Sequence, residues 1–340
     1  MRHHPSVILF IVALFAAPGA LAAERLKPKD IETAQFMADS PSRAMTAKLQ
    51  ILLDQARFSP GVIDGHMGEN VELAIAAYRA AHGLGEDSKV DEATWNSLSE
   101  NYNGPVLKEY KITKDDVDGP FTKKIPASLE EQAKLKRLSY TGPRELLAEK
   151  FHMDEDFLEE LNPGARFDKA GTTITVAAVG EENLRDPPKV SRVEIDKARK
   201  QLRVYAEDQT LFAVYPATIG SESRPAPSGE FKVEEVVKHP NYTYNPDYEF
   251  KGVEAKKPFT IAPGPNNPVG SIWIQVAEDG YGIHGTPEPS KIGKTFSHGC
   301  VRLTNWDAEE LARLVKKGTP VIFLDPPGGE PARSAAGGRP

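Results

Sequence analysis

A histidine and the only cysteine of the chain stand close enough in the sequence to share one site. His284 lies sixteen positions before Cys300, and Cys300 closes the run Ser297, His298, Gly299, Cys300. A free thiol has a pKa of about 8.5 and is only a few per cent thiolate at neutral pH. A nucleophilic cysteine therefore needs a base or a cation beside it. The residue types in this segment predict nucleophilic catalysis by a thiol that a histidine activates.

Either of two histidines could be that base. His298 lies two residues before the cysteine and points elsewhere if this segment is extended, whereas a hairpin return can bring His284 face to face with Cys300. We therefore predict His284 as the base. Gly299 has no Cβ, so a backbone N–H can approach a developing oxyanion there. The alternative for a lone cysteine is a buried, small apolar residue.

The elements that must position this pair are predicted to be strands. Apolar and polar residues alternate over several segments between 190 and 325, which predicts β-hairpins. Residues 307–317 predict the only convincing helix of this region, with Lys316 and Lys317 at its carboxyl end. The insertion 237–258 is rich in tyrosine and is either a lid over the site or a flap that does not touch substrate.

The residues before 190 are organised differently. Residues 43–98 predict two amphipathic helices, a turn over 63–68 and a third short helix. Residues 99–137 are polar and interrupted by Pro and Gly, so we expect a linker with little structure of its own. Residues 138–179 predict the order strand, helix, helix, strand. The tail 326–340 is rich in Gly, Pro and Ala and is predicted to be disordered.

Residues 1–22 predict a cleaved secretory signal peptide. A basic start is followed by eleven apolar residues, Val7 to Ala17, and by a small-x-small cleavage pattern at 20–22. Eleven apolar residues are too few for a membrane anchor, because a bilayer core needs about 20, and no later segment is longer. We therefore expect an exported protein without a membrane span.

Composition excludes several other classes of protein. The formal net charge is −7 and the isoelectric point is near 5.7, which disfavours nucleic acid as a partner. One cysteine cannot form an intramolecular disulfide. The chain shows no carboxylate pair, phosphate-binding loop or metal-ligand spacing, so we expect no metal and no other cofactor.

The cysteine segment resembles the catalytic domain of the L,D-transpeptidases (YkuD type). The family pattern, His-x(14–17)-[Ser/Thr]-His-Gly-Cys-x-[Asn/Arg], is matched by His284, by Ser297 to Cys300, and by Arg302. Further family features occur at Gly220, at 227–231 and at 264–270. The resemblance covers residues 190–325.

This resemblance implies a role for each motif residue. Cys300 attacks the carbonyl of the diamino acid at position three of a peptidoglycan stem peptide, D-alanine leaves, and a thioester remains. His284 moves the protons and is oriented by the backbone carbonyl of Gly285. The N–H groups of Gly299 and Cys300 bind the oxyanion, and two further residues, Ser297 and His298, brace the loop.

Three other side chains are candidates for substrate binding. Arg302 suits a substrate carboxylate, because its guanidinium can hold two oxygens; the alternative is a surface ion pair with Asp307 or Glu309. Trp273 and Tyr281 are placed to line a peptide groove, although an aromatic residue in a strand is more often part of a core.

The two upstream segments resemble families that bind the cell wall. Residues 43–98 resemble the peptidoglycan-binding domain 1 family, and residues 138–179 resemble a degenerate LysM module whose usual Gly-Asp-Thr opening is missing. Together the three resemblances imply a multidomain α+β protein: a three-helix module, a small βααβ module and a mainly β catalytic domain. They also imply peptidoglycan as the partner and, with the low isoelectric point and Arg302, a Gram-negative periplasm.

The sequence leaves the acceptor of the acyl group open. A second stem peptide, a D-amino acid or an outer-membrane lipoprotein are all compatible with the resemblance. The same Cys-His pair could instead release the acyl group to water, as an L,D-carboxypeptidase or crosslink hydrolase. A third possibility is a cell-wall-binding protein without catalytic activity, against which the intact His284 and Cys300 argue.

Overall fold

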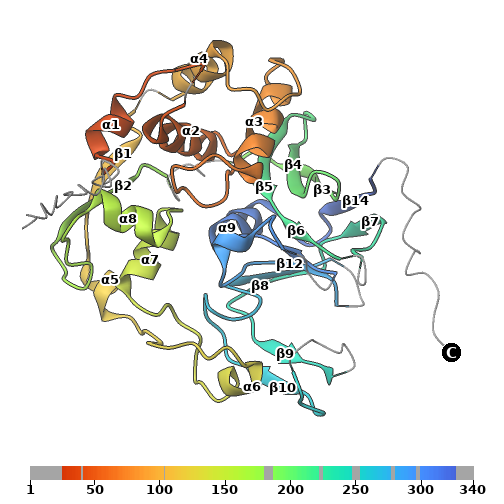
Figure 1. Ribbon diagram of the computed structural model, residues 1–340. Coiled ribbons are helices and arrows are strands. Elements are labelled where there is room, and N and C mark those ends of the chain that lie inside the picture. Colours follow the sequence, from red (N-terminus) through yellow and green to blue (C-terminus); the bar gives the residue numbers. More distant parts are fainter. Residues whose placement is uncertain are drawn as a thin grey trace, which may run out of the picture.

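The computed structural model describes residues 25–39, 41–102, 104–179, 187–221, 225–246, 253–276, 280–295 and 299–326 (Figure 1). The predicted signal peptide, nearly all of the predicted tail, and Ser297 and His298 lie outside these residues. Within the described ranges, no helix has both the length and the apolar character that crossing a membrane requires.

The first module is helical, as its apolar periodicity predicts. Ser42 and Asp91 each cap a helix, because their side-chain oxygens accept hydrogen bonds from Met45 N and Thr94 N respectively. Gln50 accepts a hydrogen bond from Gly65 N at 2.8 Å and so fastens the turn over 63–68 to the helix before it. The helices are α1 (Pro28–Glu32), α2 (Arg43–Gln55), α3 (Glu69–Ala81) and α4 (Glu92–Glu100).

The prediction that residues 99–137 form a linker with little structure is wrong, because most of this segment belongs to the central module. Its first strand is β1 (Leu107–Lys111), inside that segment, and pairs antiparallel with β2 (Thr173–Ala177); the strand predicted at the start of 138–179 is absent, since residues 138–142 form no strand before α7 begins. The sequence LKEYK buries only Leu107, so it carries no apolar alternation that would identify a strand. The helices of this module are α5 (Lys114–Asp118), α6 (Leu129–Gln132), α7 (Pro143–Lys150) and α8 (Glu155–Leu161).

The C-terminal domain consists of two five-stranded sheets, ordered β6-β13-β12-β11-β8 and β5-β4-β3-β14-β7, with a hairpin of β9 and β10 beside them. The predicted hairpins are present; in the second sheet β3 and β14 pair in parallel, and the other three pairs of neighbouring strands are antiparallel. The strands are β3 (Val190–Asp196), β4 (Gln201–Ala206), β5 (Leu211–Pro216), β6 (Thr218–Ile219), β7 (Gly229–Lys232), β8 (Glu235–Lys238), β9 (Tyr242–Tyr244), β10 (Phe259–Ile261), β11 (Ile272–Gln275), β12 (Gly282–His284), β13 (Val301–Arg302) and β14 (Pro320–Leu324).

Helix α9 (Asn305–Leu314) is the one long helix among the described residues of this domain, and it ends earlier than predicted. Val315 is already extended, and the N–H of Lys316 donates to the hydroxyl of Thr319. Lys316 and Lys317 therefore lie beyond the helix rather than in its last turn. The turn with Thr319 competes locally with the helix, which apolar periodicity does not reveal.

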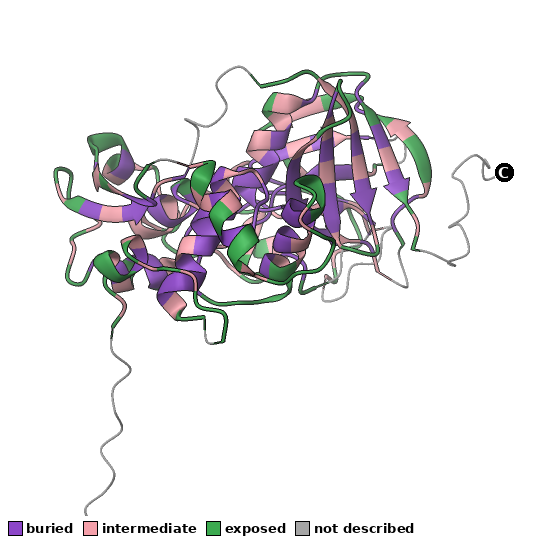
Figure 2. Cartoon of the chain, turned by 90° about the horizontal axis from the view of Figure 1, so that it is seen from above, coloured by how far each residue is buried: buried purple, intermediate pink, exposed green. Residues whose placement is uncertain are grey.

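Two apolar cores hold the molecule together. The buried residues of the first two modules form one cluster, and those of the two sheets and α9 form another. Figure 2 shows these buried segments along the inner sides of the helices and strands. The first module also extends the second sheet, because Ser59 N donates to Val214 O and Val214 N donates to Arg57 O, both at 2.8 Å. Helix α9 lies between the central module and the first sheet (Figure 1).

Candidate active site

The first sheet places the predicted histidine on the strand beside the one that the predicted cysteine precedes. Strand β12 pairs parallel with β13, so that Ile283 is opposite Val301 and His284 is opposite Arg302. Ile283 and Val301 face the core. Because side chains alternate along a strand, His284 and Arg302 face the other way. Cys300 is the residue directly before β13.

The imidazole of His284 is held in one orientation. Its Nδ1 lies 2.7 Å from the carbonyl oxygen of Gly285, and its ring is stacked on Trp273 of β11 at 5.6 Å between centroids. A carbonyl only accepts hydrogen bonds, so Nδ1 carries the proton and Nε2 has a free lone pair. Burial, with a contribution from the charge of Arg302, lowers the pKa of His284 to about 3. The side chain is a neutral imidazole at neutral pH.

The thiol of Cys300 is also uncharged at rest. Burial raises its pKa, while a hydrogen bond from the backbone of Gly282 and the charge of Arg302 oppose that rise. Its sulfur lies 3.9 Å from the carbonyl oxygen of Gly280. A neutral thiol beside a neutral imidazole requires the proton to move when the sulfur attacks, not before.

The residue before the cysteine has to be glycine. Gly299 adopts φ of 109°, and a Cβ placed on it would come within 2.9 Å of the Tyr281 ring. Both facts disfavour any other residue at this position. Tyr281, predicted as a groove residue, thus packs against the cysteine loop.

Arg302 does not make the ion pair that was its alternative role. Within the described residues, the carboxylate of Asp307 accepts a hydrogen bond from Ser59, and that of Glu309 accepts one from Ser271; neither forms an ion pair with Arg302. Burial lowers the pKa of Arg302, and Cys300, Glu288 and Tyr242 oppose that effect when they are ionised.

Tyr242 is a site residue that the sequence analysis did not assign. It begins β9, inside the predicted lid segment, and its pKa is raised to about 12 by burial and by its proximity to Cys300. The tyrosine cluster of the insertion was the available signal, but it did not show which tyrosine approaches the cysteine. Residues 247–252 of that insertion lie outside the described residues.

Two tryptophans have different surroundings. Trp273 is partly exposed and stacks on His284; its place in a groove stays a prediction. Trp306, on α9, is buried and stacks on His152 of the central module. Among the described residues, no group of three or more His, Cys, Asp or Glu side chains is arranged to hold a metal ion.

Comparison with known proteins follows the same division of the chain. Residues 191–323 match the family model YkuD, the L,D-transpeptidase catalytic domain, and residues 42–98 match a peptidoglycan binding domain model. Neither match includes the central module, so its likeness to LysM stays a prediction.

Several relatives are similar over the C-terminal half. The YkuD protein of Bacillus licheniformis, named as an L,D-transpeptidase, is 31% identical over 52% of this chain and 90% of its own length. YbiS of Escherichia coli, named likewise, is 31% identical over 55% of this chain and 61% of its own length. The crystal structure of L,D-transpeptidase 3 from Mycobacterium tuberculosis overlaps with a TM-score of 0.34 at 18% identity, over 45% of this chain and 65% of that one.

Proposed function

Because this chain belongs to the L,D-transpeptidase family, we propose that it transfers the acyl group of a peptidoglycan stem peptide to an amine, through a thioester on Cys300. The observation that carries this proposal is the arrangement of His284. It is a buried, neutral imidazole with a fixed tautomer, on the strand beside the one that directly follows the cysteine.

The first half of the reaction forms the thioester. The sulfur of Cys300 attacks the carbonyl carbon of the third stem residue while its proton passes to Nε2 of His284. The C–N bond to the terminal D-alanine then breaks, and His284 returns the proton to the departing amine. Atoms and charge balance: one thioester and one free D-alanine form.

The second half transfers the acyl group. An acceptor amine gives its proton to His284 and attacks the thioester, the C–S bond breaks, and Cys300 recovers the proton as a thiol. Backbone N–H groups at Gly299 and Cys300 are the proposed donors to the oxyanion of both tetrahedral intermediates. Ser297 and His298 keep the supporting role that the family resemblance implies.

Arg302 has two compatible roles in this scheme. Its guanidinium suits a carboxylate of the donor peptide. Its charge also lowers the pKa of His284 and opposes the rise in the pKa of Cys300, so it favours a neutral base and an anionic sulfur in the transition state. Trp273 and Tyr281 are proposed to line the peptide groove, with Tyr242 on the side of the insertion.

The modules before the catalytic domain are proposed to keep the enzyme on its polymer. Residues 42–98 match a peptidoglycan binding domain, which supports peptidoglycan as the partner. We further propose export to the periplasm after removal of residues 1–22, and glycan contact by the LysM-like central module. An outer-membrane lipoprotein is one proposed acceptor beside a second stem peptide.

Product analysis tests the proposal. The purified mature chain is incubated with disaccharide tetrapeptide, and products are identified by mass. A dimer that has lost one D-alanine is the expected product; a disaccharide tripeptide alone would assign hydrolysis instead. Cys300→Ala is the control and is expected to give neither product, whereas turnover by that variant would overturn the proposed chemistry.

A further inference from the structure

The backbone that orients His284 is itself held by one side chain. Oδ1 of Asn305 occupies the space beside two glycines: a Cβ would lie 2.2 Å from it on Gly285 and 2.1 Å from it on Gly270. Gly285 supplies the carbonyl that accepts from His284. Because any Cβ at these two positions would collide with Asn305, both residues have to be glycine. The same close packing limits how far the backbone of Gly285 can move.

The side-chain amide of Asn305 is fixed by three hydrogen bonds. Its Oδ1 accepts from Ser271 N at 3.1 Å, and its Nδ2 donates to Pro265 O at 3.2 Å and to Oε2 of Glu149 at 2.9 Å. Asn305 is 2% exposed. Rotation of the amide by half a turn would oppose like groups at these contacts, so one orientation is strongly preferred.

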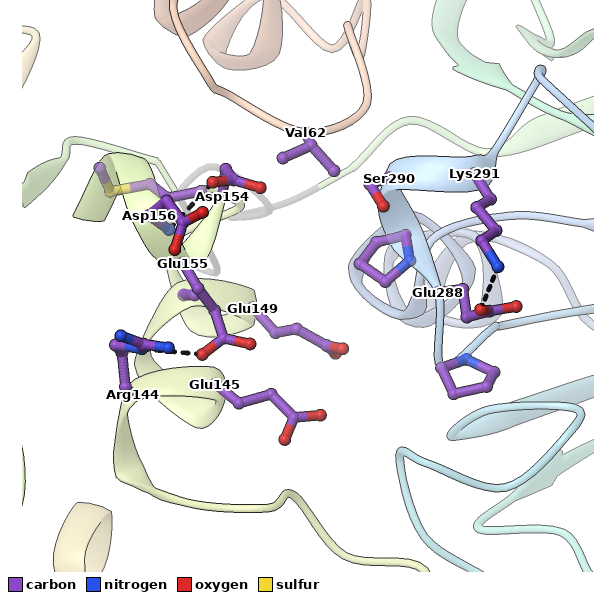
Figure 3. A pocket seen from close by; sticks show the side chains of 14 residues that line it. Val62, Arg144, Glu145, Glu149, Asp154, Glu155, Asp156, Glu288, Ser290 and Lys291 are labelled. Carbon is purple, nitrogen blue, oxygen red and sulfur yellow. Dashed lines mark hydrogen bonds and ion pairs between the residues drawn. The ribbon is translucent and has the colours of Figure 1, made fainter. Parts of the chain in front are cut away.

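One of these three partners comes from another module. Glu149 lies on α7 of the central module, is buried, and is also contacted by the hydroxyl of Tyr140 at 3.4 Å. It lines a cleft of about 340 Å³ between α7, α8 and residues 287–291, the segment just after the catalytic histidine. Figure 3 shows Glu145 and Glu149 pointing from α7 toward the side of the cleft that carries Glu288 and Lys291.

The buried carboxyl of Glu149 costs folding free energy, and its hydrogen bond from Asn305 offsets part of that cost. Burial raises the pKa of Glu149 to about 8; the hydrogen bond from Asn305 opposes that rise, and the charges of Glu145 and Glu309 add to it. An apolar residue of similar size would avoid this cost and is often neutral or stabilising at such sites. What an apolar residue cannot do is accept a hydrogen bond from Asn305.

We propose that Glu149 is a positioning residue for His284, so that the docked central module completes the active site. Glu149 holds Asn305, Asn305 holds the backbone of Gly285, and the carbonyl of Gly285 keeps the proton of His284 on Nδ1. The inference rests on the proposed function for its effect on turnover, but the state of the imidazole can be measured without turnover.

The test compares three variants by nitrogen NMR of ¹⁵N-histidine-labelled protein and by steady-state kinetics. Glu149→Met removes the acceptor and the buried carboxyl together. Glu149→Gln keeps an acceptor oxygen and is the rescue variant. Glu310→Gln is the matched control, because Glu310 is a mostly buried carboxyl on α9 whose hydrogen-bond partner is Tyr215 and not Asn305.

The expected results separate positioning from stability. In the wild type, Glu149→Gln and Glu310→Gln, His284 carries its proton on Nδ1; in Glu149→Met the signals report a mixture of tautomers. The kcat of Glu149→Met falls about 10- to 100-fold with KM within about twofold, as for other residues that orient a catalytic ligand. Glu149→Ala is measured as a fourth variant. The tautomer of His284 is then judged from whichever of Glu149→Met and Glu149→Ala keeps a cooperative thermal transition.

A single Nδ1–H tautomer of His284 in the folded Glu149→Met or Glu149→Ala protein would overturn the inference, even if transfer persists. A wild type that shows no transfer while the tautomer depends on Glu149 would overturn the proposed function and leave the positioning role standing. Equal loss of kcat in Glu149→Gln and Glu149→Met would also contradict the inference.

Discussion

Two histidines of this molecule are stacked on tryptophans and yet have opposite electrostatic surroundings. His284 lies on Trp273 with an interplanar angle of 22°, and His152 lies on Trp306 with an angle of 10°. The Nδ1 of His284 faces the carbonyl oxygen of Gly285 at 2.7 Å. The Nδ1 of His152 faces the carboxylate of Asp54 at 2.9 Å.

The partner of Nδ1 decides the charge of each ring. Burial and the cation of Arg302 lower the pKa of His284 to about 3. Burial works in the same direction on His152, but Asp54 and the nearby carboxyls of Asp307 and Glu310 outweigh it and raise the pKa. A carbonyl orients an imidazole without protonating it, so His284 remains a base, whereas His152 is suited to an ion pair at the junction of the three modules.

The largest expected effect is a loss of catalysis when His284, and not His152, is replaced. His284→Asn removes the base and is predicted to lower the rate of thioester formation by about 10²–10⁴-fold, the usual range for general acid–base catalysis. His152→Asn is predicted to leave this rate within about threefold, because His152 contacts none of the reacting groups. Single-turnover kinetics with the tetrapeptide donor measures both. Comparable losses of rate in His284→Asn and His152→Asn would contradict the assignment of His284 as the base.

The second prediction concerns Arg302, whose charge adds to the effect of burial on the pKa of His284. Arg302→Gln is predicted to raise the pKa of the Cys300 thiol and to slow its alkylation by iodoacetamide at pH 7 about tenfold, which corresponds to about one pKa unit. Arg203→Gln, on β4 near Asp196, is the control. An unchanged alkylation rate in Arg302→Gln would show that Arg302 acts on substrate alone.

The third prediction is a loss of stability as pH rises from about 4 to 8, which originates at the module junction. Burial raises the pKa of Glu149 and of Asp307 to about 8. Unfolded carboxyls release their protons near pH 4, so between pH 4 and 8 the folded state holds more protons and the free energy of unfolding falls as pH rises.

The pKa of His152 is also raised, and its contribution is likewise lost as pH rises through its folded value. Thermal unfolding between pH 5 and pH 8.5 measures the combined effect. Glu149→Gln should flatten the profile by about 1–2 kcal/mol at the alkaline end. If the stability of Glu149→Gln depends on pH as steeply as that of the wild type, the group whose protonation stabilises the folded state is not Glu149.

The smallest predicted effect is at acid pH, where only one of the two histidines changes the stability. The pKa of His284 is lowered on folding, so its burial costs stability as pH falls below about 6.5. His284→Asn should therefore lose less stability than the wild type between pH 6.5 and 4, by about 1 kcal/mol, whereas His152→Asn should follow the wild type, because the raised pKa of His152 makes its contribution complete below about 6.5. Denaturant unfolding at these two pH values measures the difference, and a common slope for both variants would contradict it.

The sequence predicts the parts of this molecule that depend on local pattern. The motif around Cys300 places the cysteine, its glycine and the arginine, and apolar periodicity places α2, α3 and most of α9. Strand β1 was missed because its pairing with β2 depends on residues about sixty positions away, and its own sequence is polar. Tertiary contact overrides local propensity in such a strand.

The contacts that orient the site could not be predicted either. Glu149 and Asn305 are 156 positions apart in the sequence, and nothing in the residues around either one indicates the other. The different roles of His284 and His152 have the same origin, because the carbonyl and the carboxylate that distinguish them are brought together only by the packing of modules. The motif therefore predicts which residues take part in the chemistry, whereas the contacts that orient His284 are known only from the folded structure.

The most direct test is to mix the enzyme with disaccharide tetrapeptide, quench the reaction with acid after a short time, and measure the intact mass of the enzyme. We predict an adduct with the mass of the donor minus D-alanine, located on the peptide that contains Cys300. Hydroxylamine should remove this adduct, and His284→Asn should form almost none of it. Release of D-alanine without any such adduct, or an adduct that forms equally fast in His284→Asn, would contradict this prediction.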